Sequence, residues 1–496
     1  MLYYSTRDIK KEQGVSSSYA VLHGLAPDGG LYMPESIPQT DEAFLLKLAD
    51  CDYAERAVEI LSLFLTDYTR DELRVCAEAA YSEDRFPGEP APLCKVRGRL
   101  WSLELWHGPT CAFKDMALQI MPRLLSLALG KNGSDKDLLI LVATSGDTGK
   151  AALEGYRDAE RIKILVFYPS EGVSRVQKLQ MITQRGSNTS VCGITGNFDD
   201  AQTGVKRLFS DSRFANKLSS LGYATSSANS INWGRLVPQI VYYYSAYCDL
   251  LNSGAIRMGD KIDFVVPTGN FGDIFAAYVA SLMGLPVGRL VCASNRNNIL
   301  TDFLRTGTYD RNRPFYLTSS PSMDILISSN LERLLYLTAG PELTAGYMKT
   351  LSETGRYTVS EEVMKEITRT FTGLFATEEE TAAAIGELWK TDRYLCDTHT
   401  AVAMSCAGRY MRESPAMRPV VVVSTASPYK FAGAVFEAVS GSEAPSGYDA
   451  LSALSAFTGT DIPGPLQGLD RAEIRFPGVC DPEEMEAVCL GFAGGR

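Results

Sequence analysis

Hydrophobic positions follow two different periods along this chain. Up to about Asp84 they recur at helical spacing, with amphipathic stretches at 41–49 and 53–66 and one cluster of glycine and proline turns. This pattern predicts a small, mostly helical N-terminal domain. A proline-rich stretch, RFPGEPAPLC at 85–94, interrupts the pattern, so we expect the first domain to span residues 1–90.

Beyond this boundary, short runs of β-branched residues alternate with amphipathic helical patterns. Such alternation predicts βαβ units and a parallel sheet. The runs form an earlier and a later series, which two sheets or one large sheet with a long insertion would explain. They lie at 138–145, 162–170, 190–196, 263–268, 289–295 and 420–425.

The segment 296–393 carries more helix signals than the chain around it, which predicts a helical insertion or lobe packed beside the sheet. A chain of 496 residues is long enough for several domains, because single cores stop growing at about 250–300 residues. We expect a catalytic region of two α/β lobes at 91–440 and a C-terminal segment, 441–496, that packs on it.

The net charge of the chain narrows the range of partners. At −11 it disfavours nucleic acid and anionic membranes. The N-terminal sequence is polar, and no run of about 18 apolar residues follows it. We therefore expect neither a signal peptide nor a membrane span, and we place the protein in the cytoplasm.

The spacing of cysteines and histidines gives no sign of a metal site. The 11 cysteines include no CxxC pair, and the 3 histidines, His23, His107 and His399, are far apart in sequence. We expect reduced thiols in the core and no bound metal.

Four segments carry candidate chemistry, and the first is GNFGD at 269–273. It follows a predicted strand and precedes an apolar helix. Glycines on both sides of Asn270 and Phe271 let the backbone turn sharply and direct several amides to one point ahead of a helix N-terminus. Such a turn suits a phosphate group. An ordinary turn between strand and helix explains the same letters equally well.

The second segment is ATSGDTGKAA at 143–152. Ser145, Thr148 and several amides precede a helix here and could bind a carboxylate or phosphate of a substrate. A Walker A sequence would need glycine where Thr144 stands, so ATP binding loses its best support. Capping of the helix by Ser145 or Asp147 is the alternative interpretation.

The third segment, LELWHGPTCAFKD at 103–115, places Lys114 among apolar residues such as Phe113 and Met116. Burial of a lysine disfavours its charged form, so its pKa falls and the neutral amine becomes nucleophilic enough to form a Schiff base. Taken alone, a surface lysine at a helix start is the simpler interpretation.

The fourth segment, STASPYKF at 424–431, ends a very apolar predicted strand with small hydroxyl residues. A buried Thr425 hydroxyl could hold one neutral polar atom of a ligand. More often, such a residue caps the helix that follows.

Together, HGPTCAFKD, ATSGDTG, PTGNFGD and TASPYKF, in this order, resemble the threonine synthases. The stretches GVSSSYAVLHGLAPDGGLYMPESIP and SANSINWGRLVPQ are similar to that family as well, so the resemblance extends from about Tyr4 to Phe431. It implies an α/β protein with the tryptophan-synthase-β-like fold type II of pyridoxal-phosphate enzymes. That fold has parallel-rich open sheets with flanking helices, here with a small, mostly helical N-terminal domain.

The resemblance also implies site residues and a cofactor, pyridoxal 5'-phosphate. Lys114 would form the Schiff base and act as general base, with Phe113 beside it. The amides of Gly269, Asn270, Phe271 and Gly272 would hold the cofactor phosphate, and Thr425 would bind the pyridine nitrogen. The candidates for gripping the phosphate or carboxylate of the substrate are Ser145, Thr148, Asn229 and Arg235.

The implied reaction converts O-phosphohomoserine and water into threonine and phosphate. The family often reads TAHPAKF in the last motif, whereas this chain has Ser427 and Tyr429, which leaves the role of that histidine open. His107 and His399 match family positions, and packed or capping histidines are the simpler interpretation. By resemblance, we expect a monomer.

Other functions remain open from the sequence. A related phospholyase would use the same residues to eliminate phosphate and give 2-oxobutyrate. A non-catalytic protein that binds a nucleotide or another ligand would normally carry GxGxxG after a strand, which this chain lacks, and would leave Lys114 unexplained. A serine/threonine dehydratase fits the N-terminal stretch and HGPTCAFKD less well.

Overall fold

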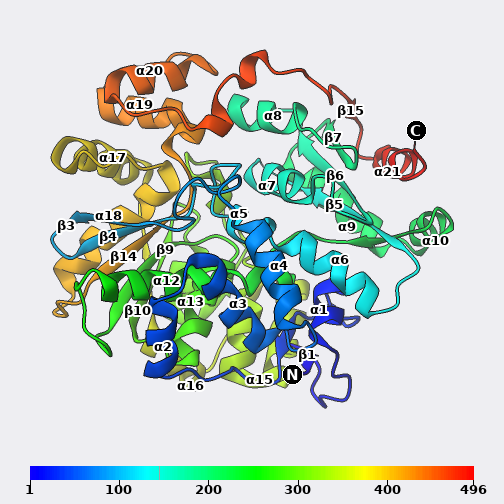
Figure 1. The fold of residues 1–496 in the computed structure, drawn as a ribbon, viewed down its shortest axis with the longest axis horizontal. Helices are drawn as coiled ribbons and strands as arrows, with labels where there is room; N and C mark the ends of the chain where they lie inside the picture. Colours follow the sequence, from blue (N-terminus) through cyan, green and yellow to red (C-terminus); the bar gives the residue numbers. More distant parts are fainter. Residues whose placement is uncertain (145, 172, 496) are drawn as a thin grey trace.

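Two parallel-rich sheets organise the computed structural model, which describes residues 1–144, 146–171 and 173–495 (Figure 1). A six-stranded sheet has the order β13-β10-β9-β14-β4-β3, and a five-stranded sheet the order β15-β7-β6-β5-β8. Of the strand pairs in these sheets, only β3 with β4 is antiparallel in the part that the structure describes. The larger sheet consists of β3 (Leu93–Arg97), β4 (Leu100–Glu104), β9 (Ile262–Pro267), β10 (Val287–Ser294), β13 (Phe371–Phe375) and β14 (Val420–Ser424).

Alternate residues of the larger sheet enter two different hydrophobic cores. In β14, Val421 and Val423 belong to the core that contains α12 (Gln239–Asn252) and α13 (Gly272–Met283). Val420 and Val422 belong to the core of α18 (Thr398–Glu413) on the opposite face. Since both faces are covered, the strand is apolar at every position instead of alternating, as expected for a parallel sheet.

The smaller sheet is formed by β5 (Asp137–Ala143), β6 (Ile162–Pro169), β7 (Thr189–Ile194), β8 (Tyr223–Ser226) and β15 (Val479–Cys480). One face packs against α7 (Asp147–Tyr156), while Leu139 and Leu141 point into a separate core beneath α9 (Phe198–Ser210) and α10 (Ser212–Ser220). The other helices of this lobe are α5 (Asp115–Leu118), α6 (Met121–Lys131) and α8 (Arg175–Ile182).

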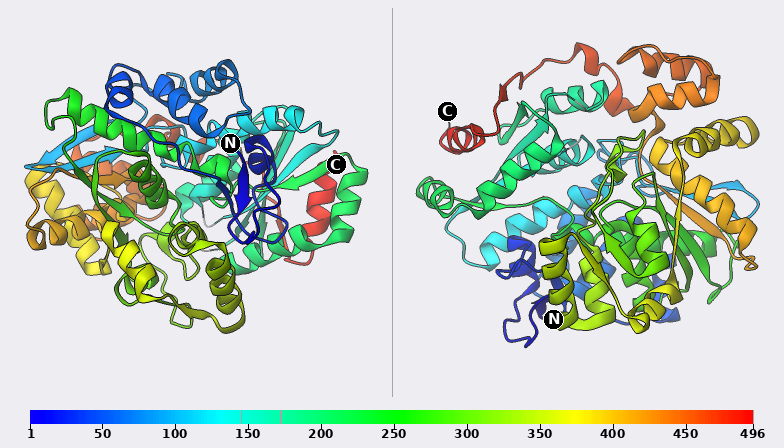
Figure 2. Two further views of the ribbon diagram at one scale, coloured as in Figure 1. Left: turned by 90° about the horizontal axis from the view of Figure 1, so that it is seen from below. Right: turned by 180° about the vertical axis from the view of Figure 1, so that it is seen from behind.

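The C-terminal segment crosses from one lobe to the other, as the right-hand view of Figure 2 shows. Within it, α20 (Asp449–Thr458) packs on α19 (Ala432–Ser440), the helix that precedes the segment. It then reaches the smaller sheet, where β15 pairs with β7 in the register Val479↔Gly193, and it ends in α21 (Met485–Ala493). The tail therefore contributes a strand to the sheet.

The N-terminal region is mostly helical, as predicted. It contains α1 (Ser17–His23), α2 (Glu42–Ala49), α3 (Tyr53–Phe64) and α4 (Arg70–Ala80). The expected helices at 41–49 and 53–66 are confirmed, and Asp52 and Glu55 form a capping box that fixes the start of α3. The helical periodicity did not predict a small antiparallel pair, β1 (Tyr3–Ser5) with β2 (Tyr32–Pro34).

The segment 296–393 is not only a helical insertion, and that expectation needs correction. It contains α14 (Ile299–Thr306), α15 (Leu331–Thr354), α16 (Glu361–Thr370) and α17 (Glu378–Asp392), together with the strand pair β11 (Thr308–Asp310) and β12 (Arg356–Thr358). However, β13 joins the larger sheet in parallel beside β10. Of the alternatives left open by the sequence, two sheets are found instead of one.

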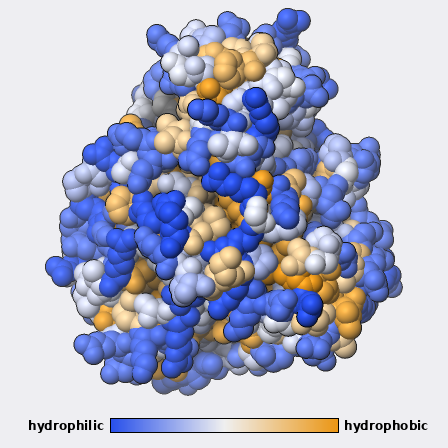
Figure 3. Space-filling model, turned by 90° about the vertical axis from the view of Figure 1, so that its left-hand side faces the viewer, coloured by the Kyte–Doolittle hydropathy of each residue, from blue (hydrophilic) through white to orange (hydrophobic). Residues whose placement is uncertain are grey.

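The surface on the side of α17, α19 and α20 is mostly hydrophilic, and its hydrophobic residues form small groups separated by polar ones (Figure 3). No helix among the described residues is both long enough and apolar enough to cross a membrane.

Candidate active site

Lys114 lies directly before α5, at the end of the loop that leaves β4. Only 7% of the residue is exposed, and its Nζ lies 3.6 Å from Asp147 Oδ2 and 4.9 Å from the centre of the Phe113 ring. Burial lowers the pKa of Lys114, although the charge of Asp147 opposes this effect. A surface lysine at a helix start, the simpler interpretation of the sequence, is therefore wrong.

The Lys114 loop is bound to the segment that follows β14. Phe113 N–H donates to Thr425 O (2.8 Å), and Ser427 N–H donates to Cys111 O (3.0 Å). These bonds flank an antiparallel bridge between Ala112 and Ala426. Two of the predicted segments, far apart in sequence, thus form one unit, with Lys114 beside the buried Thr425.

The glycine turn at 269–272 joins β9 to α13. Phe271 adopts a left-handed conformation (φ 64°), and a Cβ on Gly269 would lie 2.8 Å from the Ser322 carbonyl oxygen. Ser328 Oγ donates to Gly269 O (2.8 Å), while Asn330 donates to Asn270 O from Nδ2 (2.9 Å) and from its amide (3.1 Å). The carbonyls of this turn are thus held by the chain around 328–330.

The amides of the same turn are free. Within the described part of the chain, the N–H groups of residues 269–272 have no hydrogen-bond acceptor. Four such donors at the N-terminus of a twelve-residue helix suit a bound anion, because backbone N–H groups and the helix dipole both favour negative charge there.

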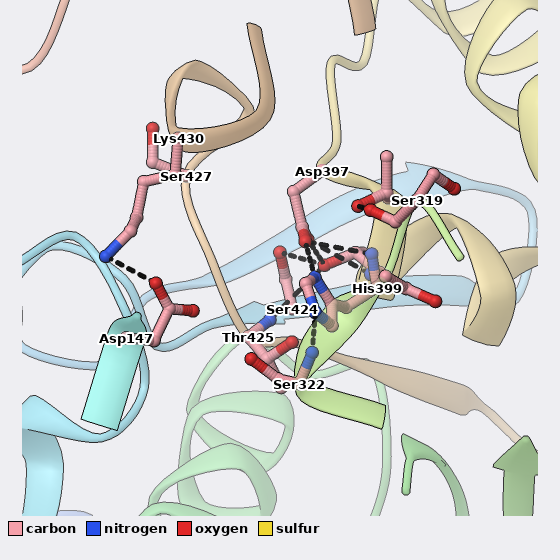
Figure 4. Close-up of polar contacts among 12 residues, drawn as sticks. Asp147, Ser319, Ser322, Asp397, His399, Ser424, Thr425, Ser427 and Lys430 are labelled. Carbon is pink, nitrogen blue, oxygen red and sulfur yellow. Dashed lines mark hydrogen bonds and ion pairs between the residues drawn. The ribbon is translucent and has the colours of Figure 1, made fainter. Parts of the chain in front are cut away.

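Asp147 binds two lysines at once. Lys430 Nζ lies 2.8 Å from Asp147 Oδ1 (Figure 4). Lys114 lies on the side of the other carboxylate oxygen, and Gln177 Nε2 donates to Oδ1 as well (2.8 Å). Burial would raise the pKa of Asp147, but Lys430 and then Lys114 lower it well below its ordinary value. The sequence did not identify Lys430, although it lies within the STASPYKF segment, because nothing local shows its partner.

Arg235, in α11 (Trp233–Leu236), is a buried cation near Lys114. Only 6% of it is exposed, its Nη1 donates to Ala228 O (2.7 Å), and burial lowers its pKa to about 10. Its charge is among those that lower the pKa of Lys114. No carboxylate within the described residues lies at ion-pair distance from its guanidinium. A buried cation without a counter-ion favours an anionic ligand.

The remaining candidates for binding the substrate are Asn229, Thr148 and Ser145. Asn229 is half-buried, and its amide donates to Ser227 Oγ (3.2 Å). Ser230, next along this loop, adjoins the glycine turn, since a Cβ on Gly272 would lie 3.5 Å from its Cβ. Thr148 lies half-buried in the first turn of α7, and Ser145 falls outside the described residues.

Comparison with known proteins assigns this arrangement to a family. Residues 2–81 match the model of the threonine synthase N terminus, 88–426 that of pyridoxal-phosphate dependent enzymes and 400–488 that of the threonine synthase C-terminal region. The threonine synthase of Pseudomonas aeruginosa is 39% identical over 88% of this chain and 90% of its own length. The chain belongs to the threonine synthase family of pyridoxal-phosphate-dependent enzymes.

Solved structures of threonine synthases share the fold along the whole chain. The pyridoxal-phosphate-bound enzyme from Brucella melitensis is 37% identical, with a TM-score of 0.88 and coverage of 99% of each chain. The yeast enzyme is 33% identical, with a TM-score of 0.89 and coverage of 100% of this chain and 99% of its own. The predicted family and the fold type II architecture are therefore confirmed.

Other relatives carry a different name. Human threonine synthase-like 1 is 40% identical over 88% of this chain, which spans about 60% of that protein's length. The threonine synthase family thus includes proteins that are named only as threonine synthase-like.

The cofactor of this family member is pyridoxal phosphate, and the site fits it. A buried lysine with a lowered pKa suits a covalent link to an aldehyde, and the amides at 269–272, which have no acceptor among the described residues, suit a phosphate. Thr425, which is 6% exposed, uses its N–H and carbonyl in the hydrogen bonds to Thr400 and Phe113, and its hydroxyl makes no hydrogen bond to a described residue, so it is available to a ligand atom.

Asp273 is a buried carboxyl that the sequence indicated only as the end of GNFGD. The hydroxyls of Tyr242 and Tyr243 donate to its Oδ1 (2.5 and 2.6 Å). Its Oδ2 is buried without a partner among the described residues. Burial raises the pKa of Asp273 to about 6, while the two tyrosine hydrogen bonds and then the charge of Lys114 oppose the shift.

The two departures from the threonine synthase motif take local structural roles. Ser427 caps the turn at 428–431 by accepting from Tyr429 N–H (3.3 Å), and Tyr429 Oη donates to Thr460 O (2.7 Å). Both residues line a pocket of about 210 Å³ together with Glu104 and Arg393. They therefore connect the last motif to the C-terminal segment.

The two histidines at family positions differ from each other. His107 is partly exposed, stacks on Trp106 with ring centres 4.1 Å apart and bonds to Glu104 through Nε2 (2.8 Å). His399 is 3% exposed and bonds to Asp397 at the start of α18. The cap itself comes from Asp397, so of the two simpler interpretations His399 is a packed histidine and not a capping one.

Proposed function

We propose that this chain is a threonine synthase, a carbon–oxygen lyase that converts O-phospho-L-homoserine and water into L-threonine and phosphate, the last step of threonine biosynthesis. The observation that carries the proposal is the buried Arg235 without a carboxylate partner among the described residues, close to Lys114. The turn at 269–272 provides for the phosphate of the cofactor. Arg235 is therefore available to bind a second anion, as expected for a substrate that carries a phosphate group of its own.

In this proposal, Lys114 holds the aldehyde carbon of the cofactor, with Phe113 packed beside it. The amides of Gly269, Asn270, Phe271 and Gly272 hold the cofactor phosphate, and the Thr425 hydroxyl binds the pyridine nitrogen. When bound, pyridoxal phosphate supplies a conjugated system that takes up the electrons released as the substrate loses its Cα proton.

Lys114 also acts as the general base at the substrate Cα. A lysine amine must be deprotonated before it can accept a proton, and the burial of Lys114 favours the neutral amine. Asp147 would oppose this by stabilising the ammonium form, but Lys430 already balances most of its charge. The pair Asp147–Lys430 therefore leaves Lys114 free to cycle between its two protonation states.

Arg235 from α11, Asn229 from the loop before it and Thr148 from the first turn of α7 bind the substrate, together with Ser145 of the ATSGDTG motif. Arg235 would stabilise the phosphate that leaves Cγ, because a buried guanidinium interacts strongly with an oxyanion where water is excluded.

The test is to measure phosphate and threonine released from O-phosphohomoserine in the same tube. Equal amounts of the two products are expected. Phosphate release with 2-oxobutyrate and no threonine would replace the proposal with a phospholyase. Lys114→Ala should abolish both products, whereas Lys390→Ala, which removes an exposed lysine in the last turn of α17, should leave them unchanged.

A further inference from the structure

The first turn of α18 contacts two segments that lie at opposite ends of the candidate cofactor site. One is the loop 319–324, which contains a short 3-10 turn at Pro321–Met323. The other is the Ser424–Thr425 end of β14. Figure 4 shows Asp397 and His399 between these two segments. The sequence drew attention to this turn only through His399, which matches a family position.

Asp397 is the centre of the network. It is fully buried and caps α18, and its Oδ2 accepts from the amide (2.9 Å) and from Nδ1 (2.7 Å) of His399. Its Oδ1 accepts from the amide of Thr400 (3.0 Å) and from the Thr400 hydroxyl. Four donors and a helix N-terminus satisfy this buried carboxylate, which has no lysine or arginine partner among the described residues.

The hydrogen bonds define the state of His399. Ser322 N–H donates to Nε2 (3.2 Å), so Nε2 carries the lone pair, and the proton lies on Nδ1, which donates to Asp397. The ring is therefore neutral and cannot rotate without breaking one of the two bonds. Phe431 packs against the ring in a T-shaped arrangement, with ring centres 4.8 Å apart.

The loop that His399 holds is the one that touches the glycine turn. Thr398 Oγ1 donates to Ser319 O (2.7 Å), so the loop has a second attachment to the same helical turn. The carbonyl oxygen of Ser322 is the atom that a Cβ on Gly269 would meet at 2.8 Å. The position of Ser322 thus determines how closely the chain covers the turn at 269–272.

Thr400, one residue further along α18, holds the other end. Its Oγ1 accepts from Thr425 N–H (3.2 Å) and lies 3.1 Å from Ser424 Oγ. Since Thr400 donates its own proton to Asp397, it can only accept from these two groups. Ser424 in turn accepts from Trp106 Nε1 (3.0 Å).

We propose that His399, anchored by Asp397, is a positioning residue that fixes the phosphate-binding turn at 269–272 through Ser322, while Thr400 fixes Thr425. This inference rests on the proposed roles of that turn and of Thr425 in holding the cofactor. His399 touches neither cofactor nor substrate in this scheme. Its substitution acts only on the phosphate end of the site.

The test compares the affinity of the apoprotein for pyridoxal 5'-phosphate with its affinity for pyridoxal, which lacks the phosphate. In His399→Leu, the ratio of the two affinities should fall about tenfold, because a buried amide loses its acceptor and the turn loses its support. His399→Gln keeps an acceptor within reach of Ser322 and should retain most of the ratio. Thr400→Val should weaken both ligands alike.

His23→Leu, which replaces an exposed histidine on α1, is the matched control and should leave both affinities unchanged. If His399→Leu fails to fold, Thr398→Val serves instead, since it removes the other attachment of the same loop. An unchanged ratio in the folded variants, or an equal loss of both ligands in His399→Leu, would overturn the inference. If the wild-type protein binds pyridoxal as tightly as pyridoxal 5'-phosphate, the proposed role of the turn at 269–272 is refuted instead.

Discussion

Lys430 and Asp147 form a buried ion pair of 2.8 Å, with the lysine side chain fully inaccessible and the carboxylate 2% exposed. The same carboxylate lies 3.6 Å from Lys114 through its other oxygen. Two lysines therefore share one negative charge, and the protonation of Lys114 depends on a residue that lies far away in sequence.

Lys430→Met should raise the pKa of Lys114, for two reasons. A nearby positive charge disappears, and Asp147 is left to stabilise the Lys114 ammonium alone. Capture of the cofactor aldehyde needs the neutral amine, so the pH midpoint of the capture rate should move upward. Stopped-flow absorbance of apoprotein mixed with pyridoxal phosphate at a series of pH values measures this midpoint.

Two further variants make this prediction specific. Lys430→Arg keeps the charge and should leave the midpoint near that of the wild type. Asp147→Asn combined with Lys430→Met removes both charges. The midpoint should then fall below that of the wild type, because the Asp147 carboxylate no longer opposes the lowering of the Lys114 pKa by burial. A midpoint that does not respond to any of these changes would show that Asp147 does not control Lys114.

Asp273→Asn should change how stability depends on pH. The folded-state pKa of Asp273 is raised to about 6, so ionisation is disfavoured in the folded protein and easy in the unfolded chain. The free energy of unfolding therefore falls as pH rises from about 4 to about 6. An increase of the Asp273 pKa from its ordinary value to about 6 corresponds to about 3 kcal/mol. The neutral amide of the variant does not ionise, so the variant would have no such loss.

The measurement is the thermal unfolding midpoint of both apoproteins from about pH 5 to about pH 8, which spans the raised pKa. The unfolding midpoint of Asp273→Asn minus that of the wild type should increase with pH and become constant above about pH 7. Tyr242→Phe removes a hydrogen bond that lowers this pKa, so the loss of stability should extend to higher pH. A constant difference between Asp273→Asn and wild type across this range would contradict the raised pKa.

Sequence patterns were sufficient for the elements that are long or strongly apolar. The strand at 420–424 and the helix at 53–64 were expected within two residues, because each follows one period without interruption. The strand at 371–375 was missed, since it is short and contains Gly373. That glycine has a tertiary cause: a Cβ there would lie 3.0 Å from Thr301 Cα of α14.

The same limit applies to the site. Motifs drew attention to Lys114 and to the glycine turn, because their chemistry is local. Lys430 and Asp397 act through partners that only the fold brings near, so nothing in the neighbouring residues distinguished them from other buried polar side chains. Arg235 likewise stands out as an anion-binding residue only in the folded structure, where no carboxylate of the described residues lies at ion-pair distance from it.

Arg235→Gln should lower kcat/KM for O-phosphohomoserine by about 100-fold, because a buried charge-assisted contact to the substrate is lost. The apoprotein should be as stable as the wild type or more stable, since no carboxylate is left unpaired and a buried charge is removed. Arg235→Lys should recover part of the activity. Steady-state kinetics and thermal unfolding of the same preparations check both statements. A large loss of stability with unchanged kinetics would assign Arg235 a structural role.

Gly269→Ala tests how closely the loop at 319–324 covers the phosphate-binding turn. The new methyl group would lie 2.8 Å from Ser322 O, and this contact is with backbone, which cannot move aside as a flexible side chain would. Either the turn or the loop has to shift, at a cost of about 1–3 kcal/mol in stability. The affinity for pyridoxal phosphate should fall in the same variant.

Gly272→Ala is the matched comparison within the same turn. Its Cβ would meet only side chains, with Asn330 Nδ2 at 3.4 Å and Ser230 Cβ at 3.5 Å. These are ordinary contact distances, and residue 272 already begins α13, where alanine is a better helix former than glycine. Gly272→Ala should therefore be clearly more stable than Gly269→Ala by thermal unfolding. If the two variants lose equal stability, the close approach of Ser322 to the turn does not control this part of the site, and the positioning role of His399 loses its physical basis as well.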